Sequence, residues 1–226
     1  RIVDLCCGPG QFTGLLAKSF TESEIHALDL SRPMLRCLER NVPRAIAHCE
    51  DMIEAPSLPR GEFDLVTAMN CLHHLSTEEQ VSRAIETMES LSTPDGVIFV
   101  SFLLRLKSQQ LTALYTETFG MKGFSGFERF HRDFELSMQA AWTEEEMVRM
   151  IPSSPTKTWF LITPMGVSTV FFLIGIPSDR DHLFLDEVQI PGEIEGIVPQ
   201  EFQVERRLLK LAFGLGRCRQ IGRSNC

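Results

Sequence analysis

The stretch Asp4-Leu5-Cys6-Cys7-Gly8-Pro9-Gly10 decides the fold of this chain. It follows the apolar residues 2–5, which are typical of a short buried strand, and it precedes residues 11–20, whose apolar side chains have helical spacing. A sharp turn that lets a ligand approach the backbone favours residues without a Cβ, and Gly8 and Gly10 supply them. The free N–H groups at the start of the next helix can bind an anionic group such as a carboxylate. The stretch therefore predicts a ligand-binding turn at the edge of a sheet.

Strands and helices alternate through the first 101 residues. Apolar runs predict further strands at residues 24–29, 45–48, 63–68 and 96–101. Helix-start signals lie between them: Ser31 is a predicted N-cap with Pro33 near the first turn, and Ser76 with Glu79 forms a capping-box pattern. Residues 93–96 (Thr-Pro-Asp-Gly) predict a turn before the fifth strand. This order indicates right-handed βαβ units and a parallel sheet.

The regular alternation of predicted strands and helices ends after residue 101. We expect a long insert at about 102–142 with one helix near 111–118, then a helix at about 144–151 opened by a second capping box, Thr143 with Glu146. Trp142 and Met147 stand where a hydrophobic staple would place them. Residues 157–162 and 168–176 follow as two strands, and the turn at 163–166 makes them a hairpin.

The last fifty residues differ in charge. Residues 178–200 carry six acids against Arg180, and residues 201–226 carry six bases against two acids. We predict a domain at 1–177 and a C-terminal extension at 178–226 that is partly helical or disordered, with an amphipathic helix at about 199–213. We expect this extension to lie outside the sheet.

Composition excludes several classes of function. The 226 residues are 43% hydrophobic with a net charge of −8, which argues against generic nucleic-acid binding. The longest apolar run, 170–176, is too short to span a bilayer, and no signal peptide is visible. The seven cysteines form no C-x-x-C pair and no zinc-like cluster. We therefore expect a cytoplasmic protein with reduced thiols, without a bound metal or a membrane span; no pattern indicates an oligomeric state.

Asp29 strengthens the prediction of a ligand site. It lies 21 positions after Gly8, at the end of the second strand, where a carboxylate can accept both hydroxyls of a ribose. The structural alternative is that Asp29 caps the next helix.

Four motifs in order resemble those of class I S-adenosylmethionine-dependent methyltransferases of the small-molecule type. The first is 4–10, and the second is 27–35, with its D-x-S-x-x-M-L run. Glu50-Asp51-Met52 resembles the third, and 63–66 through 70–75 (Asn-Cys-Leu-His-His-Leu) resembles the fourth. The resemblance implies a Rossmann-like, doubly wound, mostly parallel seven-stranded sheet with an antiparallel C-terminal hairpin strand.

The resemblance also implies the cofactor, S-adenosylmethionine, and a set of cofactor-binding residues. Asp4, Gly8 and Gly10 would shape the pocket for its methionine part, and Asp29 would hold the ribose. Asp51 would accept from the adenine amino group, with the Met52 backbone beside the ring, and Asn70 would lie beside the sulfonium. Cys6 belongs to this set but stands where the family usually has glycine.

The predicted activity is transfer of a methyl group to a small organic acceptor. His73 and His74 are weak candidates for a general base, since they can also be a recurring feature of the loop. The phenylalanines of the insert form either a lid over an apolar substrate or an anchor for a long loop. Two alternatives stay open: a catalytically degenerate S-adenosylmethionine-binding module, and a nicotinamide-dependent oxidoreductase, which fits less well because G-x-G-x-x-G lacks its last glycine here.

Overall fold

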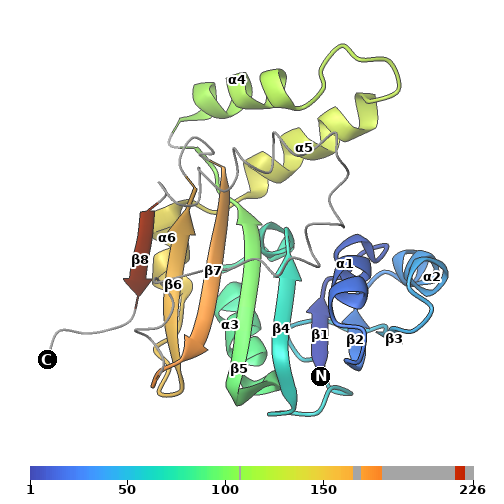
Figure 1. Cartoon of the computed structure of the whole chain (residues 1–226). Coiled ribbons are helices and arrows are strands. Elements are labelled where there is room, and N and C mark those ends of the chain that lie inside the picture. Colours follow the sequence, from blue (N-terminus) through green and yellow to red (C-terminus); the bar gives the residue numbers. More distant parts are fainter. Residues whose placement is uncertain (107, 165–168, 180–216, 222–226) are drawn as a thin grey trace, which may run out of the picture.

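The computed structural model describes residues 1–106, 108–164, 169–179 and 217–221, and these form one sheet flanked by helices (Figure 1). The strands are β1 (Ile2–Leu5), β2 (Ile25–Leu28), β3 (Ile46–His48), β4 (Phe63–Met69), β5 (Ser92–Leu103), β6 (Lys157–Thr163), β7 (Val170–Pro177) and β8 (Arg217–Ile221). The helices are α1 (Gln11–Ser19), α2 (Arg32–Asn41), α3 (Glu78–Leu91), α4 (Gln109–Phe119), α5 (Glu128–Ala140) and α6 (Glu144–Met150), with a 3₁₀ turn, η1 (Leu72–His74).

The strand order confirms the predicted fold class. The sheet runs β3-β2-β1-β4-β5-β7-β6-β8, and its first five strands are parallel. The hairpin of β6 and β7 adds antiparallel strands beside β5. The sheet is therefore doubly wound and Rossmann-like, and the ends of β1, β2, β3, β4 and β5 that carry the predicted motifs meet at one edge.

The expected count of seven strands is wrong, because the structure has an eighth. Strand β8 lies in the predicted extension and pairs antiparallel with β6, from Trp159↔Ile221 to Thr163↔Arg217. An edge strand is held mainly by backbone hydrogen bonds, so the short run Arg-Cys-Arg-Gln-Ile gave little apolar signal of it. This part of 178–226 belongs to the sheet, and the helix predicted at 199–213 lies outside the described residues.

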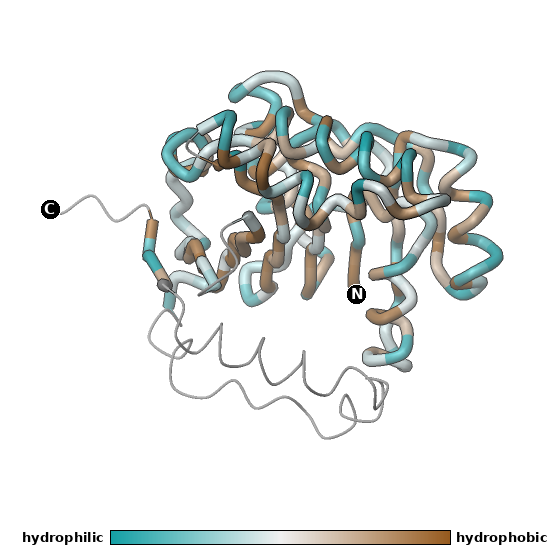
Figure 2. The backbone as a smooth tube through the Cα atoms, turned by 90° about the horizontal axis from the view of Figure 1, so that it is seen from above, coloured by the Kyte–Doolittle hydropathy of each residue, from teal (hydrophilic) through white to brown (hydrophobic). Residues whose placement is uncertain are grey.

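The two faces of the sheet are covered by different helices. One large core cluster joins α3 and α6 to β1, β4, β5, β6 and β7, with Phe63, Phe102 and Trp159 fully buried in it. Smaller clusters pack α1 and α2 against the other face at β1 and β2. Seen from above, the helices alternate brown and teal along their length, as expected of elements with one buried side (Figure 2).

Strand β5 begins four residues earlier than predicted. The segment 93–96 does not form the predicted turn between α3 and β5. It lies inside β5 as an irregularity, where the register with β4 shifts between Phe63 and Leu65. The buried Lys157 holds it: its Nζ donates to the carbonyl oxygens of Thr93 (2.8 Å), Pro94 (3.0 Å) and Gly96 (2.6 Å). Burial lowers the pKa of this lysine.

Two helices, not one, form the insert. Both α4 and α5 lie above the upper end of the sheet (Figure 1). Helix α5 gave no start signal because its N-cap, Phe127, makes no side-chain cap, and only Met138 is buried along its length. None of the described helices is long and apolar enough to cross a bilayer.

Of the two predicted capping boxes, the structure confirms one. The predicted box of Ser76 with Glu79 is wrong by one residue: Thr77 caps α3, accepting from the Gln80 N–H, and Gln80 Oε1 accepts from the Ser76 N–H. The second box is confirmed, since Thr143 and Glu146 bond each other's backbone at α6.

Candidate active site

The loop after β1 has the backbone of a ligand cradle. Cys6, Gly8 and Gly10 all have positive φ (53°, 53° and 86°). A Cβ on Gly8 would meet nothing within 4 Å, so space opens above it, whereas a Cβ on Gly10 would lie 2.6 Å from Leu38 Cδ1. Gly10 is the N-cap of α1 and offers no side chain to the N–H groups of the first turn. These donors suit a carboxylate, as the methionine part of the cofactor requires.

Asp4 lies beneath this loop. Its carboxylate is buried and accepts from Thr13 Oγ1 (2.6 Å) and Thr67 Oγ1 (2.9 Å), and burial raises its pKa to about 6. It therefore supports the loop from below through two hydroxyls that sequence reasoning missed. Thr67 left a signal, because it is a polar residue in the buried part of an apolar strand.

Asp29 ties two loops together. One carboxylate oxygen accepts from the Gly8 N–H (2.9 Å) and the other from the Ser31 N–H (2.8 Å), at the start of α2. The Ser31 bond is the helix-start contact that the structural alternative expected. Because a carboxylate oxygen can accept more than one hydrogen bond, these contacts leave capacity for hydroxyl donors from a ligand.

Sulfur atoms link the loop after β3 to the loop after β1. Cys6 Sγ lies 3.2 Å from Met52 Sδ, and Met52 is buried. The neighbouring Cys6 thiol and burial together raise the pKa of the Cys71 thiol. Asp51 is exposed, and its Oδ1 accepts from the Ile53 N–H (2.9 Å). The positive φ of Cys6 gives the physical reason why glycine is usual at this position.

Asn70 also has a positive φ, 52°, where β4 ends. Its N–H donates to the Ser101 carbonyl (2.7 Å), and its Oδ1 accepts from Ser101 Oγ (3.4 Å). Ser101 was not predicted as a site residue. The structure thus brings Asp4, Gly8, Asp29 and Asn70 to the same edge of the sheet.

His73 and His74 follow in η1 and differ in environment. Their ring centroids lie 4.2 Å apart, but His73 is buried and His74 is exposed. Burial and the neighbouring His74 lower the pKa of His73 to about 4. Its Nδ1 has no hydrogen-bond partner within the described residues. His73 is therefore neutral at pH 7.

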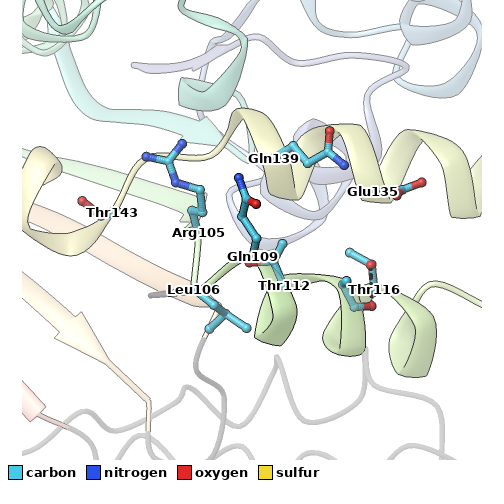
Figure 3. Close-up of a pocket in the computed structure, with 9 residues that line it drawn as sticks. Arg105, Leu106, Gln109, Thr112, Thr116, Glu135, Gln139 and Thr143 are labelled. Carbon is cyan, nitrogen blue, oxygen red and sulfur yellow. Dashed lines mark hydrogen bonds between the residues drawn. The ribbon is translucent and has the colours of Figure 1, made fainter.

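A cavity of about 700 Å³ lies between α4 and α5 (Figure 3). Seven of its nine lining residues are of polar type; the nine are Arg105, Leu106, Gln109, Thr112, Ala113, Thr116, Glu135, Gln139 and Thr143. No phenylalanine of the insert lines it, and Phe119, Phe124, Phe127 and Phe130 are exposed. No sequence pattern pointed to these residues, because the two helices that carry most of them come together only in the fold.

Trp142 joins the cavity to the loop after β4. Its Nε1 donates to the Leu72 carbonyl (3.3 Å) in η1, and its own carbonyl accepts from the Arg105 N–H (2.9 Å). The cavity and the loop that carries Asn70 are therefore held together at the same edge of the sheet.

Comparisons with known proteins agree with this architecture. Residues 2–96 match the family model described as a methyltransferase domain. The chain is 28% identical over 173 residues to a ubiquinone biosynthesis O-methyltransferase of Ralstonia nicotianae, covering 72% of this chain and 71% of that protein. It is 31% identical to the protein of the same name from Methylococcus capsulatus over 62% of this chain, and spans 60% of that protein's length.

Solved structures share the fold. A methyltransferase from Aquifex aeolicus superposes with a TM-score of 0.52 at 14% identity, covering 78% of this chain and 81% of that one. The plantazolicin methyltransferase BamL gives 0.61 at 13% identity, covering 78% and 76%. Fold and matched domain define a Rossmann-like methyltransferase. The matched domain and the fold support a class I methyltransferase with S-adenosylmethionine as its cofactor, as the motifs predicted.

Proposed function

We propose that the protein transfers the methyl group of S-adenosylmethionine to a small organic acceptor, with the cofactor held by the loops after β1 to β4. The observation that carries this proposal is the pair of hydrogen bonds that Asp29 accepts from the Gly8 and Ser31 N–H groups. Beside them, the backbone of the loop after β1 has positive φ at three residues, Cys6, Gly8 and Gly10. This arrangement presents N–H donors and a carboxylate acceptor toward one space.

Most of the predicted cofactor-binding residues have a role in this proposal. The first-turn N–H groups of α1 would bind the methionine carboxylate, supported from below by Asp4. Asp29 would accept the ribose hydroxyls, Asp51 and the Met52 backbone would face the adenine, and Asn70 would lie beside the sulfonium. When bound, the cofactor supplies a methyl group already activated by its sulfonium.

Positioning, more than proton abstraction, is expected to drive the transfer. His73 has a pKa of about 4, which makes it a weak base at pH 7. Alignment of donor and acceptor can supply much of the rate acceleration. The matched relatives are named O-methyltransferases, so we propose an oxygen as the accepting atom.

Calorimetric titration of S-adenosylmethionine tests the cofactor site. We expect Asp29→Ala to weaken binding at least about tenfold, because a charge-assisted hydrogen bond contributes about 1.5–3 kcal/mol. The exposed Asp133 in α5 gives a matched control, Asp133→Ala, which should bind like the unaltered chain. Thermal melting checks that Asp29→Ala remains folded. Equal affinity in the folded variant would show that Asp29 does not hold the ribose.

A cofactor-binding module without turnover is the second candidate. Cys6 favours it, since a thiol occupies the position at which the family usually has glycine. Incubation with methyl-labelled cofactor and a panel of hydroxyl, carboxyl and amine acceptors separates the two. Label in any acceptor eliminates the module, and tight cofactor binding without label in any acceptor favours it.

A further inference from the structure

The cavity between α4 and α5 is lined by two helical faces. Helix α4 supplies positions 109, 112, 113 and 116, and α5 supplies positions 135 and 139, so each face keeps the spacing of one side of a helix. A volume of about 700 Å³ falls within the usual range of small-molecule sites. Only Leu106 and Ala113 are apolar residues, so the other lining residues can bond or pair with polar and charged groups of a ligand.

Arg105 has hydrogen-bonding capacity to spare. Its Nη2 lies 3.2 Å from both carboxylate oxygens of Glu146, but its Nε and Nη1 have no partner within the described residues. Glu146 does not depend on Arg105, because it also accepts from the Thr143 N–H (2.7 Å) in the capping box. The hydrogens on Nη1 and Nε are therefore available to donate to an oxygen of a ligand carboxylate.

The opposite end of the cavity carries the opposite charge. Glu135 lies in α5, whereas Arg105 follows β5. Figure 3 shows Arg105 toward one end and Glu135 toward the other, with Gln139 between them. The side chains of Glu135, Gln109 and Gln139 form no hydrogen bond within the part of the chain described here. From one end of the cavity to the other, its lining thus presents a cation, two amides and an anion.

We propose that this cavity binds the methyl acceptor and that the acceptor is an elongated zwitterion. Its carboxylate would pair with Arg105, its protonated amine would pair with Glu135, and polar atoms between them would bond Gln109 and Gln139. This inference rests on the proposed function, because it gives the chemical class of the acceptor. Trp142 connects the Arg105 end to the loop that carries Asn70, which places that end toward the cofactor.

Three matched probes test the charge pattern: 6-aminohexanoate, hexanoate and hexylamine. Ligand-observed NMR titration of the full chain gives their dissociation constants. We expect 6-aminohexanoate to bind at least about tenfold more tightly than either singly charged probe, because each charge-assisted contact is worth about one decade or more. Equal binding of the three probes, or binding of none of them, would overturn the proposal.

Two variants locate the charges. Arg105→Gln should weaken binding of 6-aminohexanoate and hexanoate about tenfold and leave binding of hexylamine unchanged. Glu135→Gln should weaken binding of 6-aminohexanoate and hexylamine about tenfold and leave binding of hexanoate unchanged. Arg129→Gln, an exposed arginine on α5, is the matched control. Glu146→Gln keeps the capping-box acceptor and frees Arg105, so it should bind hexanoate at least as well as the unaltered chain.

Titration with S-adenosylmethionine distinguishes failure of the zwitterion proposal from failure of the proposed function. If S-adenosylmethionine binds but the Arg105 and Glu135 variants leave probe affinity unchanged, the zwitterion is wrong and the cofactor site stands. If the cofactor does not bind, the proposed function fails whatever the probes do. Glu146→Gln keeps the test decisive if Arg105→Gln does not fold, because weaker hexanoate binding in that variant would contradict the role given to Arg105.

Discussion

The two halves of the proposed site are built by different means. At the cofactor edge, backbone N–H groups and left-handed residues shape the surface, and side chains such as Asp4 and Asp29 hold the loops in place. In the insert, two helices present polar side chains to a cavity. A site built from backbone leaves a sequence pattern of glycines, since few residues tolerate its geometry. A site built from side chains on helices leaves none.

From the comparison of these two regions, we expect the largest effect on stability at Gly10, in the loop after β1. Gly10→Ala should lower the free energy of unfolding by about 3 kcal/mol, because a positive φ costs a residue with a Cβ about 1–2 kcal/mol and the methyl group would overlap Leu38. Urea unfolding measures this. Gly8→Ala should cost only about 1 kcal/mol, since its Cβ meets nothing, yet it should weaken cofactor binding. Equal destabilisation by the two variants would contradict a cradle with open space above Gly8.

The second effect concerns His73, at the junction of the two halves. Its pKa is lowered to about 4 in the folded chain, so the unfolded chain binds the extra proton first as the pH falls below about 6.5. Stability due to neutral His73 is therefore present above pH 6.5 and lost toward pH 4, by up to about 3 kcal/mol. Asp4, with its pKa raised to about 6, acts in the opposite direction between about pH 4 and 6.

A variant separates the pH-dependent contributions of His73 and Asp4 to stability. His73→Gln removes the histidine term and keeps that of Asp4, so its stability relative to the unaltered chain should rise as the pH falls from 7 to 4. Urea unfolding at several pH values gives this difference. A difference that stays constant with pH would mean that His73 is not desolvated in the folded protein.

The smallest effect is expected in the insert. Gln139→Leu should leave the affinity for S-adenosylmethionine within about twofold and stability within about 0.5 kcal/mol, because the side chain of Gln139 makes no hydrogen bond in the described part of the chain. Calorimetry of the variant, with Gly8→Ala measured in parallel, checks this. A large loss of cofactor affinity in Gln139→Leu would show that the two halves are not separable.

Prediction from the sequence was most successful where local chemistry is restrictive. The loop after β1, Asp29 at the end of β2 and the N-cap at Ser31 were predicted from their residues alone. It failed where long-range contacts decide. The turn-like run 93–96 lies inside β5 because Lys157, more than sixty residues later, binds its carbonyls. Helix α5 lacks start signals, and β8 is an edge strand fixed by pairing with β6.

The sequence by itself determined the alternation of strands and helices through the first 101 residues, the parallel sheet and the glycine turn, because periodicity and backbone freedom act over a few residues. Tertiary structure alone decided that Thr13 and Thr67 hold Asp4, that His73 is buried, and that Arg105 and Glu135 line one cavity. These relations join residues far apart in the chain. Their strength depends on burial and distance, which only the assembled fold defines.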